Sequence, residues 1–229
     1  MAKTKKELNR ETVIEQGLNA GASVVGIAAA NDFDLAPEGF KPTDVLNGCL
    51  SVIVLGAAFP PEALDNSDEY TEKRKVIVEK ISGIAKNLAK QIKDCGYKAQ
   101  EISALGGKWV DGDGKKEHHG LISLKHAAEL AGLGIIGKNY LMLNPQYGNL
   151  LWFSAVLTDA ELIPDKKSQM TVCANCNKCV EMCPVKALEN PALFGKKECS
   201  RMFMKQVNGK WVINCFLCRK VCPCCFGNT

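Results

Sequence analysis

The chain has 229 residues, which is enough for one large domain or two small ones and excludes a long multidomain assembly. With 46% hydrophobic and 24% charged residues its composition is ordinary for a folded protein, so disorder is not the expected state. Its formal charge of +4 is too small to indicate nucleic-acid or membrane binding. No apolar run is long enough to span a membrane, and the N-terminal residues lack the apolar core of a signal peptide. We therefore expect a cytoplasmic protein without a membrane partner.

Helix and strand patterns alternate along the first 165 residues, which predicts an α+β fold whose N-terminal domain is of α/β type. The expected helices cover residues 6–21, 67–95 and 122–132, the expected strands 23–30, 51–59, 98–103 and 149–159, and residues 108–120 form a polar loop. In the long helix one apolar stripe faces the core, formed by Val76, Ile77, Ile81, Ile84, Leu88 and Ile92.

Ten of the twelve cysteines lie in the last 57 residues. Cytosolic thiols stay reduced, so this cluster indicates metal ligation rather than disulfides. A polar segment around Pro164 precedes it and predicts a boundary between domains 1–165 and 166–229. The second domain has too little apolar content for a core of its own, so we expect bound metal to stabilise it.

The cysteines form two motifs, C-x2-C-x2-C-x3-C-P at residues 173–184 and C-x2-C-x3-C-P at 215–223. They are typical of a ferredoxin-like domain with two 4Fe-4S clusters, in which the ligand sets cross between motifs. The crossed pattern assigns Cys173, Cys176, Cys179 and Cys222 to one cluster, and Cys183, Cys199, Cys215 and Cys218 to the other. A pair of zinc sites is the alternative, although zinc ribbons use two separated C-x2-C pairs.

The four remaining cysteines need a different interpretation. Cys224 and Cys225 follow the last motif, and either could replace Cys222 as a ligand or be a surface thiol beside the cluster. Cys49 and Cys95 are most simply small buried hydrophobic residues.

Residues 132–137 match the G-x-G-x-x-G pattern of dinucleotide-binding loops. Here the glycines follow a helix pattern rather than a strand, which favours a helix C-cap at Gly132 followed by a tight loop. Three glycines also permit close approach of the backbone to a ligand. The histidine pair His118 and His119 lies in the polar loop, where it could donate protons near neutral pH or simply be solvated.

The segment HAAELAGLGIIGKNYLMLNPQYGNLLWFSAVLTD at 126–159, followed by the two cysteine motifs, resembles the epoxyqueuosine reductase family. That family is related to the reductive dehalogenases. The resemblance covers almost the whole chain and is strongest from His126 to Pro223. It implies an N-terminal domain that binds cobalamin and a ferredoxin-like domain that supplies it with electrons.

The resemblance implies which residues would line a corrinoid pocket, when the family's pocket residues are carried over by position. They are Gly132, Gly134, Gly137, Lys138, Asn144, Tyr147 and Gly148. The chain departs from the family in three respects. An ungapped count puts His118 where the family has a proton-donating aspartate, and the helical repeats that follow the last cysteines in the family are missing. The twin-arginine export signal of the dehalogenases is also missing.

The leading hypothesis is an oxidoreductase that passes single electrons through two 4Fe-4S clusters to a bound cobamide, which reduces a small electrophile. His118 or His119 would supply the proton. We expect an electron donor such as a ferredoxin or flavodoxin, a small-molecule substrate and no tight binding of tRNA. The alternative is a ferredoxin-type electron-transfer protein without a corrinoid, whose N-terminal domain docks a redox partner.

Overall fold

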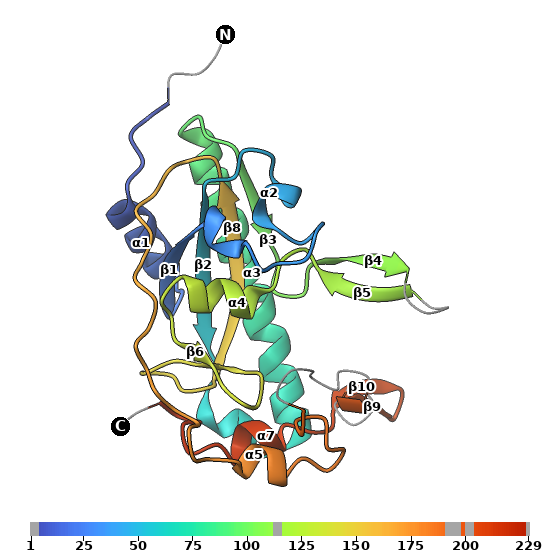
Figure 1. The fold of residues 1–229 in the computed structure, drawn as a ribbon. Coiled ribbons are helices and arrows are strands. Elements are labelled where there is room, and N and C mark those ends of the chain that lie inside the picture. Colours follow the sequence, from blue (N-terminus) through green and yellow to red (C-terminus); the bar gives the residue numbers. More distant parts are fainter. Residues whose placement is uncertain (1–4, 112–115, 191–197, 200–203, 228–229) are drawn as a thin grey trace. The chain divides into compact units, whose positions relative to one another are not determined.

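A computed structural model describes residues 5–111, 116–190, 198–199 and 204–227 (Figure 1). Its contacts group the chain into two compact units. We call the first the sheet unit, made of residues 1–57, 78–133 and 152–168, and the second the cysteine unit, made of residues 58–77, 134–151 and 169–229. The units are interleaved in sequence, whereas the sequence-based division cut the chain once, after residue 165. The division into a corrinoid-binding and a ferredoxin-like domain stays a prediction.

The sheet unit is built on a four-stranded sheet in the order β1-β2-β8-β3. Its strands are β1 (Val24–Ala29), β2 (Ser51–Ala58), β8 (Leu151–Thr158) and β3 (Ala99–Ile102), so the four predicted strands are confirmed. The outer pairs are antiparallel, with Ile27 opposite Ile53 and Ile102 opposite Ala155. Nearly every residue of the two central strands is buried, which explains why their sequences are continuous apolar runs.

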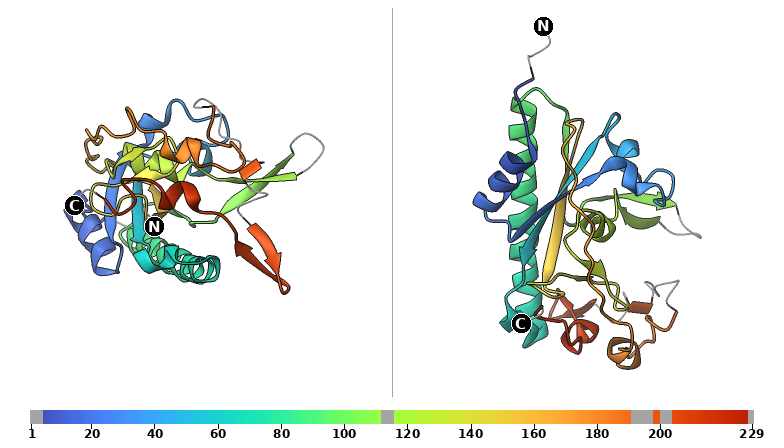
Figure 2. Two further views of the ribbon diagram at one scale, coloured as in Figure 1. Left: turned by 90° about the horizontal axis from the view of Figure 1, so that it is seen from below. Right: turned by 60° about the vertical axis from the view of Figure 1, so that its left-hand side comes forward.

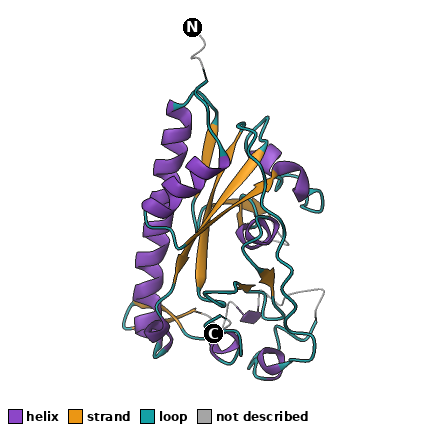
Figure 3. Cartoon of the chain, turned by 90° about the vertical axis from the view of Figure 1, so that its left-hand side faces the viewer, coloured by secondary structure: helices purple, strands orange, loops and turns teal. Residues whose placement is uncertain are grey.

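Three helices accompany the sheet: α1 (Arg10–Asn19), α3 (Ser67–Asp94) and α4 (Leu124–Leu130). Figure 3 shows α3 running along the strands, and within the sheet unit the Ser154 hydroxyl of β8 donates to the carbonyl of Ile81 at 2.9 Å. The predicted stripe on α3 is buried except for Val76, which is 59% exposed. Val76 precedes the buried Ile77 by one residue, a rotation of about 100° around the helix, so the prediction was wrong for Val76.

The segment predicted as a polar loop forms a hairpin instead. Strands β4 (Gly107–Asp111) and β5 (Lys116–Gly120) pair antiparallel, with Trp109 opposite His118 and Lys108 opposite His119. Figure 2 shows the hairpin projecting from the rest of its unit. A strand without a buried face lacks apolar alternation, which is the signal that sequence analysis uses to find strands.

The remaining elements are short. They are η1 (Ala30–Phe33), α2 (Pro42–Val45), η2 (Pro61–Leu64), β6 (Ile135–Ile136), β7 (Met142–Leu143), α5 (Lys178–Glu181), β9 (Met204–Val207), β10 (Lys210–Ile213) and α7 (Leu217–Lys220). In the described part of the chain, no helix has the length and apolar content needed to cross a membrane.

The last segment of the sheet unit is tied to β1 by Asp165. One carboxylate oxygen of Asp165 accepts from the backbone N–H of Ile27 at 2.8 Å, and the other pairs with the guanidinium of Arg10. The backbone N–H of Asp165 in turn donates to the carbonyl of Ile27 at 2.8 Å. One side chain therefore joins helix α1, strand β1 and the segment that leads out of the sheet unit.

We predict that Asp165→Ala lowers the free energy of unfolding by about 1–3 kcal/mol, because it leaves the buried N–H of Ile27 without its acceptor. Asp165→Asn keeps an acceptor oxygen and removes the charge, so it should lose less. The measurement is urea unfolding followed by far-UV circular dichroism under anaerobic conditions. Equal stability of the Ala variant and the wild type would contradict the assignment.

Candidate metal centre

Five thiols of the cysteine unit surround one cavity of about 210 Å³. The cavity is lined by Cys173, Cys176, Cys179, Cys222 and Cys224, together with Asn139, Val172 and Pro223. Its volume is several times the share of one water molecule, roughly 30 Å³. Among the described residues, no three acidic, histidine or cysteine side chains converge on a point as they do around a single metal ion. A cavity of this size lined by several cysteines suits a multinuclear cluster.

Local backbone geometry brings the first three cysteines to this cavity. Cys173 has a left-handed φ of 65°, and the N–H of Cys176 donates to its carbonyl at 3.4 Å. Cys179 is buried on the short helix α5. The ammonium of Lys138 donates to the carbonyl of Cys176 at 3.1 Å and to Asn177 Oδ1 at 2.8 Å, so it supports this segment from outside the cavity. Four thiols predicted as one ligand set therefore line one cavity with Cys224.

Three members of the second predicted set also lie together. Burial, together with the nearby thiols of Cys199 and Cys215, raises the pKa of Cys218 to about 12. The thiol of Cys179 acts on Cys218 in the same direction, so the two groups of cysteines are neighbours within the unit. Cys183, the fourth member, follows α5 and is half-buried. The assignment of each thiol to a cluster stays a prediction.

Burial also keeps other thiols of this unit protonated when no metal is bound. Desolvation raises the pKa of Cys179 and of Cys222, and it raises the pKa of Cys225 to about 11. A thiol must lose its proton to bind a metal, so these positions need a nearby cation to become ligands.

Two buried asparagines and one buried arginine, which sequence reasoning missed, hold the cysteine segments. Asn139 donates to the carbonyl of Cys218 at 3.2 Å, and Asn149 donates to the carbonyl of Arg219 at 3.1 Å. Asn149 Oδ1 also accepts from the guanidinium of Arg219 and from the thiol of Cys225. Arg219 is only 5% exposed, and its charge opposes the upward shift in the pKa of Cys218 and of Cys225. Both asparagines flank the L-x-L-N-P-x-Y-G segment, which was their only signal in the sequence.

The glycines predicted for a corrinoid pocket have structural reasons within their own units. Gly132, with φ 72°, ends helix α4 in a Schellman motif: its N–H donates to Glu129, and the N–H of Leu133 donates to Ala128. The predicted helix C-cap is therefore confirmed. A Cβ at Gly134 would overlap the carbonyl oxygen of Leu143.

Other predicted corrinoid residues shape the turn around residue 146. Asn144 Oδ1 accepts from the N–H groups of Gln146 and Tyr147, each at 2.9 Å. A Cβ at Gly148 would overlap the carbonyls of Cys224 and Cys225, and one at Gly137 would meet Leu143. These contacts account for the residues within the unit, and their role toward a corrinoid stays a prediction.

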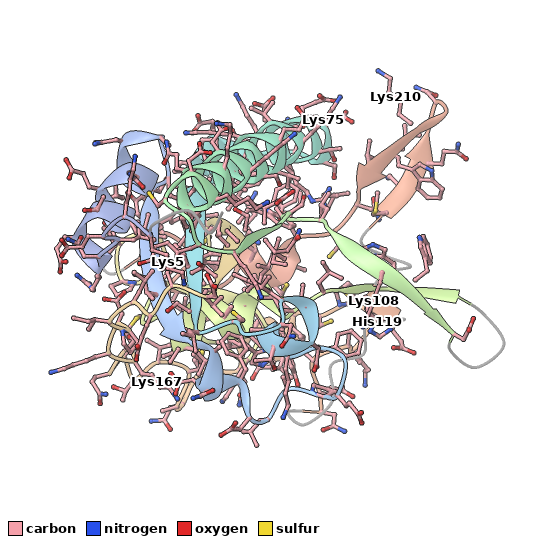
Figure 4. The ribbon with its side chains drawn as sticks, turned by 90° about the horizontal axis from the view of Figure 1, so that it is seen from above. Lys5, Lys75, Lys108, His119, Lys167 and Lys210 are labelled. Atoms are coloured by element: carbon pink, nitrogen blue, oxygen red, sulfur yellow. The ribbon has the colours of Figure 1, made fainter. Side chains whose placement is uncertain are left out.

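The two histidines lie side by side on β5 and thus point to opposite faces of the hairpin. The rings of His118 and Trp109 are nearly perpendicular, with centroids 5.3 Å apart, whereas the ring centroid of His119 lies 5.7 Å from that of Phe40. Lys108, beside His119 in Figure 4, places its ammonium 4.4 Å from the same Phe40 ring. The two imidazoles therefore have different surroundings, and only one of them can face a given ligand.

The two remaining cysteines differ in burial. Cys49 is buried at 3% exposure, as predicted. Cys95 is half-buried, because it follows the last residue of α3, so the prediction of burial was wrong there.

No family model matches the chain. A curated epoxyqueuosine reductase from Prochlorococcus marinus (strain NATL2A) is 25% identical over 234 residues, covering 93% of this chain and 68% of the relative. A solved epoxyqueuosine reductase in complex with an epoxyqueuosine-modified tRNA stem loop superposes with a TM-score of 0.60 at 19% identity, covering 94% of this chain and 64% of the other. A reductive dehalogenase, described as carrying out B12-dependent dehalogenation, superposes with a TM-score of 0.70 at 20% identity, covering 93% and 31%.

The chain spans about two thirds of the length of these epoxyqueuosine reductases and about a third of the dehalogenase. The mixed α+β fold is shared with both groups. The sequence likeness extends over nearly the whole chain. The chain is therefore similar in sequence to epoxyqueuosine reductases, and its fold resembles both theirs and that of the reductive dehalogenases.

Proposed function

We propose that the chain is an iron-sulfur oxidoreductase that passes single electrons through two 4Fe-4S clusters. The observation that carries this proposal is the cavity lined by Cys173, Cys176, Cys179 and Cys222. A cubane cluster takes its four ligands from thiolates spaced as in these motifs. The second cluster would be held by Cys183, Cys199, Cys215 and Cys218.

Two features of the site support electron relay. Helices α5 and α7, which carry Cys179 and Cys218, contact each other, so the two ligand sets are neighbours, as successive one-electron carriers must be. The buried guanidinium of Arg219 lies beside Cys218 and Cys225. Its positive charge favours the more negative state of a nearby cluster, so Arg219 would ease reduction. Charge and hydrogen bonding at the ligand sulfurs are the main means by which a protein sets a cluster potential.

We predict that anaerobically purified protein holds about eight irons and about eight inorganic sulfides per chain. Cys176→Ala should lose about half of both, because it removes one ligand from one cavity. Cys95→Ala, outside both sets, is the matched control and should keep the full content. Iron and sulfide analysis together with electron paramagnetic resonance is the measurement. Two equivalents of zinc without a visible chromophore would refute the proposal.

We further propose that the two clusters pass their electrons to a bound cobamide. When bound, the cobamide would supply the reducing metal centre for a small electrophilic substrate. The family's structural relation to a dehalogenase described as B12-dependent supports this step. On this chain's side, the residues carried over for binding are Lys138, Asn144, Tyr147 and the loop glycines. The proton would come from His118 or His119.

We predict that cob(II)alamin added anaerobically changes the optical and paramagnetic spectra of the wild type on binding. His118→Ala and His119→Ala should keep that binding and differ in turnover, because their rings face opposite sides of β5. Gly134→Val is unsuitable as a binding variant, since its side chain would collide with Leu143. No spectral change with fully loaded clusters would contradict the cobamide step and leave the ferredoxin-type electron carrier.

The natural substrate is proposed only by class, as a small electrophile. One relative is solved with an epoxyqueuosine-modified tRNA stem loop. Our chain has a formal charge of only +4, and two bound clusters with their thiolates would offset part of its positive charge. We therefore propose that the chain does not bind tRNA tightly.

A further inference from the structure

The cavity holds one thiol more than a cluster needs. A 4Fe-4S cluster takes four cysteine ligands, but five thiols line this cavity, and Cys222 and Cys224 stand on either side of Pro223. We propose that Cys222 and Cys224 are interchangeable as the fourth ligand of this cluster. This inference rests on the proposed iron-sulfur function and concerns only which sulfur completes the site.

A tight turn brings both thiols to the same cavity. The N–H of Cys225 donates to the carbonyl of Cys222 at 3.0 Å, which closes a β-turn with Pro223 at its second position. Within this turn the backbone N–H of Cys224 also donates to the sulfur of Cys222. An exchange of ligands therefore requires a local side-chain movement and leaves the chain path unchanged.

The turn at residues 222–225 packs against the segment around Gly148. Gly148 has φ 55°, and any Cβ there would overlap the carbonyls of Cys224 and Cys225. The N–H of Asn149 donates to the carbonyl of Cys225 at 3.1 Å. This support fixes the backbone of the turn, so Cys222 and Cys224 both stay at the cavity wall.

Cys225 is held away from this role. Its side chain is 1% exposed, and its thiol donates to Asn149 Oδ1 at 3.5 Å. The five thiols that line the cavity include Cys224 but not Cys225. Of the two candidates that the sequence leaves open, geometry thus selects Cys224.

The exchange conserves atoms and charge. The bond from iron to the sulfur of Cys222 breaks, and a bond from the same iron to the sulfur of Cys224 forms. The proton released by the thiol of Cys224 is taken up by the departing sulfur of Cys222. No electron moves, so the cluster keeps its oxidation state. The Cys222 sulfur accepts hydrogen bonds from Asn149 and from the N–H of Cys224, so the two forms differ in the hydrogen bonding of the ligand sulfur.

The test compares Cys222→Ala, Cys224→Ala, the double variant and Cys225→Ala as control, purified anaerobically. Each single variant should keep about eight irons, while the double variant should fall to about four. The reduced-cluster paramagnetic spectrum of Cys222→Ala should differ from that of the wild type. Loss of about four irons in Cys222→Ala alone would overturn the exchange. Absence of iron from the wild type would instead refute the proposed function.

A second, independent observation concerns charge. Residues 199–229 include five basic side chains and no acidic one, whereas the rest of the chain carries one more acidic than basic residue. The entire net charge of +4 therefore comes from this segment. Within it, the hairpin β9–β10 lies between Cys199 and Cys215, two predicted ligands of the second cluster.

The hairpin exposes both apolar and basic side chains. Trp211 is 60% exposed, Met204 39% and Val207 38%. Lys205 and Lys210 are exposed as well. Strand alternation places Lys205, Val207 and Lys210 on one face of the hairpin, and Met204 and Trp211 on the other. Two exposed lysines beside an exposed apolar side chain are typical of a contact surface for an acidic protein. We infer that a small acidic electron-transfer protein docks on this hairpin and reduces the second cluster. This inference also rests on the proposed electron relay.

The test uses reduced flavodoxin as the probe and follows cluster reduction by stopped-flow absorbance at low salt. Lys205→Glu with Lys210→Glu should lower the second-order rate constant at least fivefold, because steering depends on opposite charges. Lys75→Glu with Lys86→Glu on α3 changes the net charge equally at exposed positions and should have a much smaller effect.

Reduction by dithionite, a small reagent, should be unchanged in both double variants. Equal flavodoxin rates in the hairpin variant and the wild type would overturn the docking surface. Salt-sensitive, submicromolar tRNA binding lost in the hairpin variant would assign the surface to RNA instead. Clusters that dithionite cannot reduce would refute the electron relay itself.

Discussion

The cysteine unit depends on one constraint: a buried thiol becomes a ligand only if a cation compensates its lost proton. Burial raises the pKa of Cys179, Cys218 and Cys222, so without metal these thiols are neutral at pH 7. Iron that binds four thiolates must displace their protons, and the free energy of that binding then counts toward folding. The described C-terminal segments have few buried apolar residues, such as Leu188, Val212 and Ile213. The proposed metal ligation would thus replace much of the core that a segment of this length lacks.

The same constraint gives Arg219 a reason to be buried. A guanidinium with 5% exposure is costly unless hydrogen bonds and negative charges surround it. Asn149 Oδ1 accepts a hydrogen bond from the guanidinium at 3.4 Å, and the sulfurs of Cys218 and Cys225 lie near it. Thiolates bound to iron would stabilise the arginine, and the arginine would stabilise the thiolates. Cluster binding and burial of Arg219 therefore support each other.

Periodicity and spacing predicted the elements whose partners are close in sequence or whose faces are fully buried. Helix α3 and strands β2 and β8 were found because their apolar patterns directly reflect burial. The cysteine motifs were found because the spacing of their cysteines can be read directly from the sequence. Hairpin β4–β5 was missed because its sequence has no apolar alternation, and Asn139 and Asn149 were missed because their partners are 70 or more residues away. Long-range polar contacts of this kind have no local signature.

The glycine loop shows what a shared motif can and cannot carry over. The family resemblance gave Gly132, Gly134 and Gly148 a role in binding a corrinoid, but contacts inside each unit already require glycine there. Gly132 closes a helix, Gly134 lies against the carbonyl of Leu143, and Gly148 seats the Cys224–Cys225 turn. A motif kept for such reasons marks a common scaffold whether or not the ligand is retained. A corrinoid is therefore indicated by side chains that the scaffold does not need, and half-buried Tyr147 is one of them.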